Sequence, residues 1–554
     1  MSARQPIIVI NQNTEREQGR KAQLGNIQAG RAVSDIIRTC LGPKAMLKML
    51  LTSFGIVMTN DGNAIMRELE VNHPAAKSMI ELSRAQDEEV GDGTTSVIIL
   101  AGEMLTVAEP WLERDIHPII ITRAFRRALN DALAHVETIA KSVDNNKTEL
   151  LKIIETCIGT KYIAKWSGLM CNLAYDAVSL VVDQLDAQTT DIDIKRYLKV
   201  EKIPGAEVGE SKVVRGVVVN KDVTHANMRR RIENPRIVLL DCPIEYKKGE
   251  SQTDVEIESS GNFEQMLRLE EEYIKDMCDA ILKHKPDIVI TEKGLCDLAQ
   301  HYFVKAGVTG LRRFRKSVNN RIARAVGATI VSRVEEIKES DIGTGCGLFE
   351  VRKIGDEYYT FLEQCKAPKS CTVMLRGASK DVLNEIDRNL VDAFHITRNI
   401  MLDPRLVPGG GATEMSIATH LSEKAKSIEG VQQWPYRSVA VAMEVIPRTL
   451  AQNCGAKTVR SMTQLRAKHA SDPQKNASWG IDGEVGRIVD MNELGIWEPL
   501  SVKVQTIKTA IESACMLLRV DDIVSGTKNK DGSSSGGGGG GGMPGGMGGM
   551  PGGM

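Results

Sequence analysis

The sequence predicts a multidomain, helix-rich chain of the α+β class, in which an α/β module interrupts a largely helical body. Three observations support this class. Apolar residues recur at helical spacing over 75–140 and again after about residue 375. Short runs of β-branched residues lie between about 213 and 362. At 554 residues, the chain is also long enough to form several domains.

The first third of the chain is expected to be mostly helical. A helix is predicted over 26–40, and 41–44 breaks it before a second helix that follows a short loop. The segment 55–65 is expected to form a β-hairpin with Asn60-Asp61-Gly62 at its turn. Long helices are expected from about 75 to 140.

The middle of the chain has the pattern of an α/β module. Helical spacing over 263–282 separates two short buried strands, and Gly355-Asp356 is expected at the turn of a hairpin. The predicted strands are 213–219, 236–241, 287–290 and 328–331, with the hairpin over 349–362. After about 375 the helical pattern resumes, so the module is expected to be an insertion between two halves of one base.

Composition narrows the range of functions. The formal net charge is −1, and no domain-wide basic surface is visible, which argues against nucleic acid as a partner. Two short basic clusters, at 229–231 and 312–316, are interpreted as solvated surface or subunit contact. No run reaches the roughly 18 apolar residues that span a bilayer, and residues 1–10 lack a secretory signal pattern. A soluble, cytoplasmic protein that binds no membrane is expected.

The eleven cysteines and nine histidines are scattered, and no Cys-x-x-Cys pair occurs, so a zinc site is disfavoured. Cys365 and Cys371 could approach each other across a turn, but two reduced thiols are expected in a chain without a secretory signal. The Gly- and Met-rich segment 527–554 is expected to be a flexible tail, because it has little to bury.

The segment Gly91-Asp92-Gly93-Thr94-Thr95-Ser96 has the composition of a phosphate site. Its glycines let backbone amides turn toward an anion, and the hydroxyls and free amides of a following helix add donors. A carboxylate would repel phosphate unless a cation lay between them, so Asp92 is interpreted as a ligand of Mg²⁺. The alternative is an ordinary capped helix start after a tight turn.

Two later segments support the same interpretation. Asp392 is predicted on a helical face with Glu385 and Asn389, opposite an apolar stripe, although an ordinary solvated carboxylate is the alternative. Gly409-Gly410-Gly411 precedes a helix predicted over 412–421, which repeats the pattern of an anion site at a helix start. Neither a P-loop motif nor the protein-kinase motif set occurs.

These segments, in this order, resemble the group II chaperonins over essentially the whole chain. The resemblance rests on motifs that are well separated in sequence, which are 41–44, 59–62, 91–96, 375–377, 407–414, 489–490 and 495–499. Within that family the chain resembles one subunit type of the eukaryotic cytosolic chaperonin, on the segments 36–40, 246–254 and 445–450. The tail departs from the tails expected for that subunit type.

The resemblance implies an ATP hydrolase with ATP or ADP and Mg²⁺ at its site. Asp392, assisted by Asp61, would orient or activate the attacking water, and Asp92 would bind Mg²⁺. The implied nucleotide-binding residues are Gly42, Pro43, Gly93, Thr94, Thr95, Ser96, Thr160, Lys161, Gly410, Gly411, Gly483, Glu484, Asp490, Glu498 and Lys503.

The resemblance also implies three domains in a discontinuous order. The expected bounds are 1–145 and 405–526 for an equatorial ATP-binding domain, 146–214 and 370–404 for an intermediate hinge domain, and 215–369 for an apical domain. A helical lid protrusion is expected at about 247–283, and a helix facing client proteins within 312–328. Strand-like segments at 7–10 and 516–523 are expected to pair between subunits, with the hairpin around Asp61 as their neighbour.

The implied partners are seven paralogous subunits in a double eight-membered ring, together with unfolded clients of the actin and tubulin class. Two other functions compete with this one. A small-molecule kinase would need an acceptor pocket with a second set of catalytic residues, and no such set is found in the sequence. A scaffold subunit that binds nucleotide without turnover is disfavoured by the presence of both Asp92 and Asp392.

Overall fold

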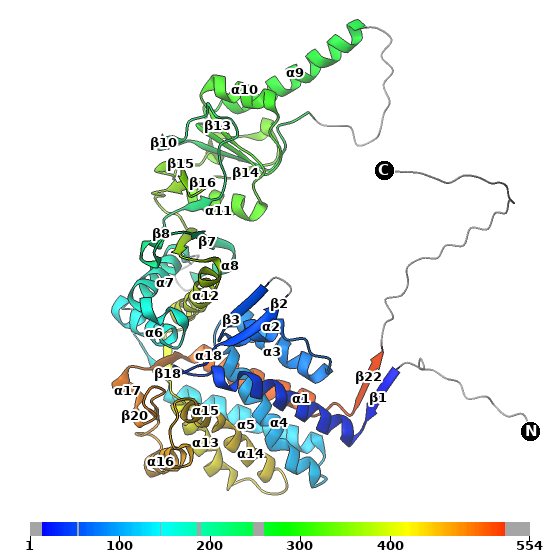
Figure 1. The fold of residues 1–554 in the computed structure, drawn as a ribbon, viewed down its shortest axis with the longest axis vertical. Helices are drawn as coiled ribbons and strands as arrows, with labels where there is room; N and C mark the ends of the chain where they lie inside the picture. Colours follow the sequence, from blue (N-terminus) through cyan, green and yellow to red (C-terminus); the bar gives the residue numbers. More distant parts are fainter. Residues whose placement is uncertain (1–13, 53–54, 144–145, 185–189, 247–259, 527–554) are drawn as a thin grey trace, which may run out of the picture.

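The computed structural model describes residues 14–52, 55–143, 146–184, 190–246 and 260–526. These residues form three bodies stacked along the long axis, which we call the lower, middle and upper body (Figure 1). Each body has its own large hydrophobic core. The chain runs from the lower body through the middle body to the upper body, and it returns by the same route.

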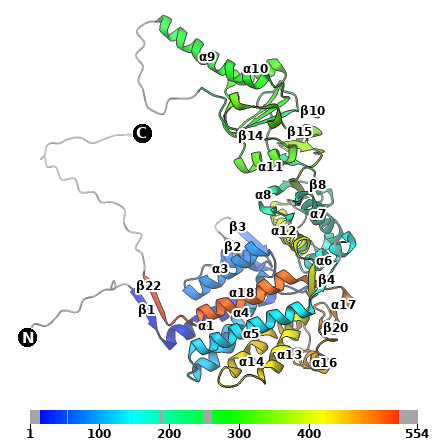
Figure 2. The same ribbon diagram turned by 180° about the vertical axis from the view of Figure 1, so that it is seen from behind.

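The lower body is built from helices of both ends of the chain (Figure 2). Its helices are α1 (Arg20–Ile37), α2 (Gly62–Glu68), α3 (Pro74–Glu89), α4 (Thr94–Glu113), α5 (Pro118–Ile139), α13 (Ala412–Ala425), α14 (Gln433–Met443), α15 (Val445–Asn453), α16 (Thr458–Ser471), α17 (Met491–Leu494) and α18 (Leu500–Leu517). Helix α4 is central, because Val97 to Ala101 are fully buried or nearly so. Among the described helices, only α4 is long and apolar enough to cross a membrane. However, 61% of its most apolar 18-residue stretch is buried inside the protein.

Short strands tie the lower body together. They are β1 (Thr14–Gln18), β2 (Lys48–Thr52), β3 (Gly55–Thr59), β4 (Lys141–Ser142), β18 (Arg405–Pro408), β19 (Trp479–Ile481), β20 (Ile488–Asp490), β21 (Trp497–Pro499) and β22 (Asp522–Gly526). Strand β18 pairs antiparallel with both β21 and β4, which joins the two halves of the chain beside the glycine run at 409–411.

The middle body packs helices against a three-stranded sheet of order β7-β17-β8. Its elements are α6 (Lys147–Gly159), α7 (Ser167–Val181), β5 (Asp183–Gln184), β6 (Thr190–Asp191), α8 (Ile194–Tyr197), β7 (Leu198–Pro204), β8 (Lys212–Val214), β17 (Cys371–Gly377) and α12 (Lys380–Leu402). Strand β17 returns from the upper body and pairs parallel with β7, so both passages of the chain share one sheet.

The upper body is the expected α/β module. A parallel sheet of order β13-β12-β11-β14 lies beside an antiparallel sheet of order β10-β15-β16-β9. The elements are β9 (Val217–Val219), β10 (Arg231–Glu233), β11 (Ile237–Leu240), α9 (Ser260–Leu282), β12 (Ile288–Thr291), α10 (Asp297–Ala306), β13 (Thr309–Leu311), α11 (Lys316–Val326), β14 (Ile330–Val331), β15 (Leu348–Ile354) and β16 (Glu357–Glu363). Helix α9 projects from the top of this body (Figure 1).

Several local predictions are wrong. The helix expected after residue 44 is strand β2, which pairs with β3 to form the hairpin. Asn60-Asp61-Gly62 therefore lies after that hairpin, at the start of α2. The strand expected over 213–219 is interrupted at Gly216, whose φ of 144° breaks it into β8 and β9.

The chain ends also differ from expectation. Residues 516–517 end helix α18, and β22 pairs antiparallel with β1 of the same chain. The segment 7–10 and the tail 527–554 lie outside the described residues, as does the first part of the expected protrusion, 247–259. The cysteines are free thiols, and Cys365 lies beside Cys346 rather than Cys371.

Candidate functional site

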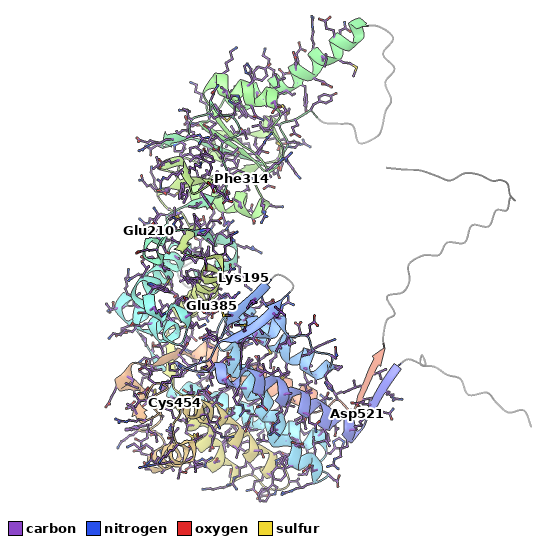
Figure 3. The ribbon with its side chains drawn as sticks, in the orientation of Figure 1. Lys195, Glu210, Phe314, Glu385, Cys454 and Asp521 are labelled. Atoms are coloured by element: carbon purple, nitrogen blue, oxygen red, sulfur yellow. The ribbon has the colours of Figure 1, made fainter. Side chains whose placement is uncertain are left out.

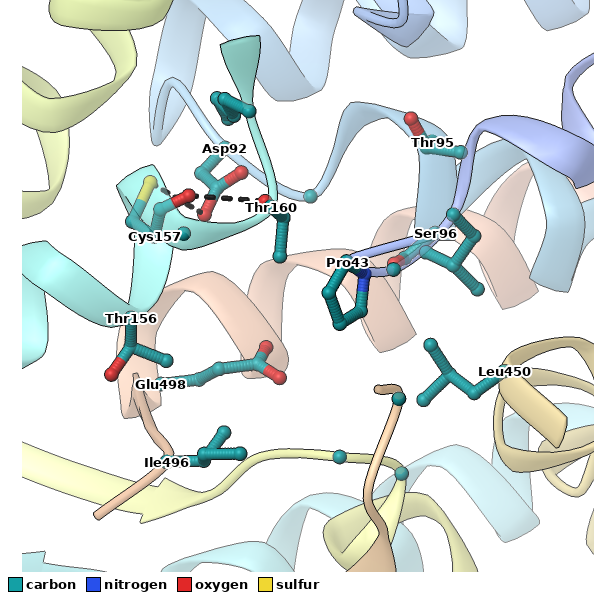
Figure 4. Close-up of a pocket in the computed structure, with 18 of the residues that line it drawn as sticks. Pro43, Asp92, Thr95, Ser96, Thr156, Cys157, Thr160, Leu450, Ile496 and Glu498 are labelled. Atoms are coloured by element: carbon teal, nitrogen blue, oxygen red, sulfur yellow. Dashed lines mark hydrogen bonds between the residues drawn. The ribbon is translucent and has the colours of Figure 1, made fainter. Parts of the chain in front are cut away.

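A cavity of about 470 Å³ lies where the lower and middle bodies meet. All but two of the eighteen predicted site residues line it, although they come from segments hundreds of residues apart. Figure 4 shows Pro43, Ser96 and Glu498 around this space, with Asp92 on the side that faces Cys157 and Thr160. The two exceptions are Asp392 and Asp490. Asp392 does not line the cavity itself but pairs with Lys161, which does.

Two helices begin at this cavity without a side-chain cap. Gly93, with φ 77°, precedes α4, and Gly411, with φ 76°, precedes α13. The first backbone N–H groups of each helix therefore have no capping side chain, and the helix dipoles direct positive potential to the same place. This arrangement suits an anion such as phosphate.

Close packing requires glycine at several of these positions. A Cβ on Gly411 would lie 2.8 Å from Pro447 Cβ, and one on Gly410 would lie 2.5 Å from the sulfur of Met491. On Gly483 it would lie 2.5 Å from Pro43 Cδ. Any side chain here would displace the neighbouring segments, so the glycines allow the segments around the cavity to pack closely.

The loop that carries Asp92 is held by residues that the motif analysis did not find. Gln86 Nε2 donates to the Asp92 carbonyl at 2.9 Å and to Thr506 Oγ1 at 3.0 Å. Asn399 Nδ2, on α12, donates to the Val90 carbonyl at 2.8 Å. Gln86 could have been found in the sequence as a polar residue on the buried face of a predicted helix. A buried amide is usually hydrogen-bonded, so such a residue indicates a structural contact.

Helix α12 also packs directly on this loop. A Cβ on Gly91, whose φ is 67°, would lie 2.2 Å from the His395 ring. Burial, with a smaller contribution from Arg398, lowers the pKa of His395 to about 4, so the ring is neutral at pH 7. The middle body therefore presses an uncharged surface against the loop that positions Asp92.

Asp61 caps helix α2 and does not lie at a hairpin tip. Its carboxylate accepts from Asn63 N at 3.2 Å and from Ala64 N at 3.0 Å. Thr94 Oγ1, at the start of α4, donates to Asp61 Oδ1 at 3.3 Å. These contacts hold the carboxylate at the cavity wall beside the predicted phosphate loop.

Asp392 is buried on α12 and forms an ion pair with Lys161, which lines the cavity. The solvated alternative for Asp392 is therefore wrong, because both faces of this part of α12 are covered. Burial raises the pKa of Asp392 well above its usual range, against the opposing attraction of Lys161. Burial acts to lower the pKa of Lys161, but Asp392 and its other anionic neighbours outweigh it and hold that pKa well above normal.

Cys157 lines the cavity close to Asp92, and sequence reasoning had not singled it out. Its sulfur lies 4.0 Å from Asp92 Oδ2 (Figure 4). Burial, reinforced by Asp92, raises the pKa of this thiol well above its ordinary value, so it remains protonated and can donate to the carboxylate. Thr160 Oγ1 donates to the Cys157 carbonyl at 3.0 Å, which ends α6 at the cavity.

A buried ion-pair network forms the other end of the cavity. Lys503 Nζ lies 2.8 Å from Glu498 Oε2 and also pairs with Glu414. Desolvation raises the pKa of Glu498, while the two carboxylates hold the pKa of Lys503 above normal against its own burial. Asp490 does not line the cavity, because its carboxylate caps α17 by accepting from Asn492 N at 2.9 Å.

The side chains fit a metal that is shared with phosphate. Among the described residues, no cluster of three or more His, Cys, Asp or Glu side chains could hold a metal ion by itself. Mg²⁺ is commonly bound by one or two carboxylates together with substrate phosphates. Asp92 and Asp61 are such carboxylates, and they lie beside the uncapped start of α4.

Comparisons with known proteins agree with one another. The family model described as the TCP-1/cpn60 chaperonin family matches residues 33–528. T-complex protein 1 subunit gamma of Schizosaccharomyces pombe is 62% identical over 526 residues, covering 94% of this chain and 99% of the relative. The Dictyostelium discoideum protein of that name is 61% identical, covering 95% and 100%, and the Homo sapiens protein is 60% identical, covering 96% and 97%.

Proposed function

The chain belongs to the TCP-1/cpn60 chaperonin family, and on that premise we propose that it is an ATP-hydrolysing subunit of a hetero-oligomeric cytoplasmic chaperonin. The group II chaperonin resemblance of its motifs is confirmed by this family, and the three subunit-type segments indicated the gamma subunit, which is also confirmed. The observation that carries the ATPase proposal is a single cavity lined by two uncapped helix starts, by Asp92 and by Lys161, whose ammonium pairs with Asp392 behind it.

The roles of the residues follow from their positions. The free amides of α4 and α13, with the hydroxyls of Thr94, Thr95 and Ser96, would bind the phosphates. Asp92 would hold Mg²⁺, whose charge neutralises phosphate oxygens and orients them for in-line attack. Asp61, held at the start of α2 beside Thr94, would support the same metal and water.

Asp392 is proposed as the group that orients the attacking water. Burial gives it a raised pKa, which brings the carboxylate nearer the range of a useful general base. Lys161 holds the side chain in one position and supplies positive charge next to the predicted site of the γ-phosphate. At the nucleoside end, Gly483, Glu484 and the Lys503–Glu498 pair would contact the remainder of ATP.

The three bodies would serve as the equatorial, intermediate and apical domains of such a subunit. Because α12 belongs to the middle body and packs on the loop that carries Asp92, a change at the nucleotide would be passed to the middle body. Helix α9 would form part of a built-in lid, and α11 would face unfolded clients of the actin and tubulin class. The complete assembly would be a double eight-membered ring with seven paralogous subunits.

A tagged copy of the chain tests this function in its native cytoplasm. The proposal expects the tag to recover a double-ring particle by electron microscopy, with eight different subunits identified by mass. That particle should release folded actin from a denatured complex only when ATP and Mg²⁺ are present. A tagged chain recovered as a monomer, or actin folding that is equally fast without ATP, contradicts the proposal.

A further inference from the structure

A second cavity, of about 1010 Å³, lies where the middle and upper bodies meet. From the middle body it is lined by α8 and the start of β7, and from the upper body by β9, the residues after it and the start of α11. Figure 3 marks the two sides with Lys195 in the middle body and Phe314 in the upper body. This cavity is separate from the one that contains Asp92.

The charge of this lining is strongly one-sided. Eight basic side chains face a single carboxylate, Glu201. The basic residues are Lys195, Arg196, Lys199, Lys221, Arg313, Arg315, Lys316 and Arg321. Of these, Arg196 pairs with Asp193, and the other seven form no salt bridge within the part of the chain that the structure describes. Most of these side chains are exposed to solvent, and an anion between them would lower their mutual repulsion.

Arg321 is the most buried of these basic side chains, and Glu201 is its electrostatic partner. It is only 9% exposed, and its Nε has no hydrogen-bond partner among the described residues. Buried charged side chains are almost always paired, because an unpaired one has a high desolvation cost. Helix α11 also begins at this cavity, at Lys316, and the preceding Arg315 provides no side-chain cap. The start of α11 and the largely buried Arg321 therefore both border this cavity.

We propose that this cavity binds a compact polyphosphate, a small molecule that carries three or more phosphate groups. A phosphate monoester carries about 1.5 to 2 negative charges and three strong acceptor oxygens. Three or four phosphate groups would therefore neutralise the excess positive charge of the lining. A ligand that carried only carboxylates, with one charge each, would need about twice as many groups. Guanidinium groups also bind phosphate in a bidentate manner, and the volume matches a small-molecule site of roughly 300–1,000 Å³.

Glu201 is compatible with an anion in this cavity. Burial raises the pKa of its carboxyl, against the opposing effect of Lys199 and Arg321, so its negative charge is less firmly held than that of an exposed carboxylate. Because the cationic groups come from both bodies, the bound anion would bridge α8 to α11. The proposal concerns this second cavity alone and does not depend on ATP hydrolysis at the first.

Equilibrium dialysis of the assembled particle tests the proposal. Labelled inorganic tripolyphosphate and labelled inositol hexakisphosphate are measured separately in buffer with EDTA, which removes the divalent ions needed at the acidic first cavity. Lys195, Lys199 and Lys221 are each changed to Gln in one variant. Because each exposed ion pair contributes up to about 1 kcal/mol, we expect the dissociation constant at this chain to rise about tenfold or more.

The matched control changes three exposed lysines outside the cavity, Lys212, Lys305 and Lys366, to Gln. It should bind both probes as the unmodified particle does, and both variants should assemble and unfold at the same temperature as that particle. A preference for the linear or the ring probe identifies the source of the phosphates. Equal binding by the two variants overturns the proposal, as does a polyglutamate peptide that binds while both polyphosphates fail.

Discussion

The cavity beside Asp92 and the cavity beside Arg321 are opposite in charge. Six acidic side chains and two lysines line the first, whereas eight basic side chains and one carboxylate line the second. The first also has two helix starts with left-handed glycines, while the second has one helix start and arginine donors. Under our proposals both cavities bind phosphate. The first would neutralise its charge with a metal ion, and the second with basic side chains.

This difference has a consequence for control. An acidic cavity binds phosphate only together with a metal ion, so its occupancy depends on Mg²⁺ and the phosphates can be positioned for reaction. A basic cavity binds phosphate without metal, and here a single carboxylate, Glu201, stands against eight basic side chains. The first is therefore suited to turnover and the second to static bridging of two bodies.

The largest effect is expected from Asp392→Ala, which tests whether the first cavity performs chemistry. Nucleotide binding should be largely retained, while this subunit's share of single-turnover hydrolysis in the assembled particle falls about 10²-fold or more, because water orientation is lost. Asp381→Ala, in the exposed first turn of the same helix, is the control and should hydrolyse normally. Unchanged turnover in the Asp392 variant would remove that residue from its role.

The metal requirement of the first cavity is tested by Asp92→Ala. The Mg²⁺ concentration needed for half-maximal nucleotide binding should rise about tenfold or more, since even residues behind metal ligands cost about 10- to 100-fold. Titration of Mg²⁺ against a fluorescent nucleotide measures this, with the variant Glu89→Ala, at an exposed position outside the cavity lining, as control. An unaltered Mg²⁺ titration would refute the ligand assignment.

Salt should separate the two cavities further. Raising monovalent salt from about 50 to about 200 mM should weaken tripolyphosphate binding at the second cavity on the order of fivefold, because its exposed cations are screened. Nucleotide binding with saturating Mg²⁺ should change less, because the Asp92 cavity is partly enclosed by the two bodies. Equal salt dependence at both sites would remove the electrostatic distinction between them.

The smallest expected effect comes from removing one carboxylate, which should change phosphate affinity in opposite directions in the two cavities. Removing a carboxylate from the first cavity weakens phosphate binding, whereas Glu201→Gln in the second should strengthen tripolyphosphate binding about threefold, because one repulsion is lost. Glu207→Gln, exposed and outside the cavity, should leave affinity unchanged. Weaker binding in the Glu201 variant would show that this carboxylate holds the cations in place rather than opposing the anion.

Short sequence motifs were enough to predict most of the residues that line the first cavity. Gly91 to Ser96 and Gly409 to Gly411 combine left-handed glycines with helix starts, and this uncapped geometry follows from backbone conformation that sequence encodes directly. Most strands of the α/β module and helix α9 were also predicted, because their apolar periods are clear, whereas β10, α10 and β13 were not. The hairpin expected at 55–65 was wrong because turn residues there cap a helix instead, and Asp is favoured in both positions.

Contacts between distant segments could not be predicted in the same way. Gln86, Asn399 and His395 hold the Asp92 loop, but none belongs to a recognisable motif, and their partners become neighbours only after α3 and α12 pack. The second cavity was even harder to predict from the sequence. The cluster at 312–316 was interpreted as solvated surface or subunit contact, and its residues at 313, 315 and 316 are exposed. The linear sequence gave no sign that the lysines at 195 and 199 line the same cavity from the other body.

The amino-acid order by itself determined the helix-rich class, the inserted module, the chaperonin resemblance and the residues of an anion site, since these depend on local periodicity and on conformations available to glycine. Only the tertiary structure decided that Lys161 pairs with Asp392, that Asp61 is a helix cap, and that eight cations surround one hollow. The physical reason is that electrostatic energy depends on distance in space and on burial, and neither is set until the bodies have packed.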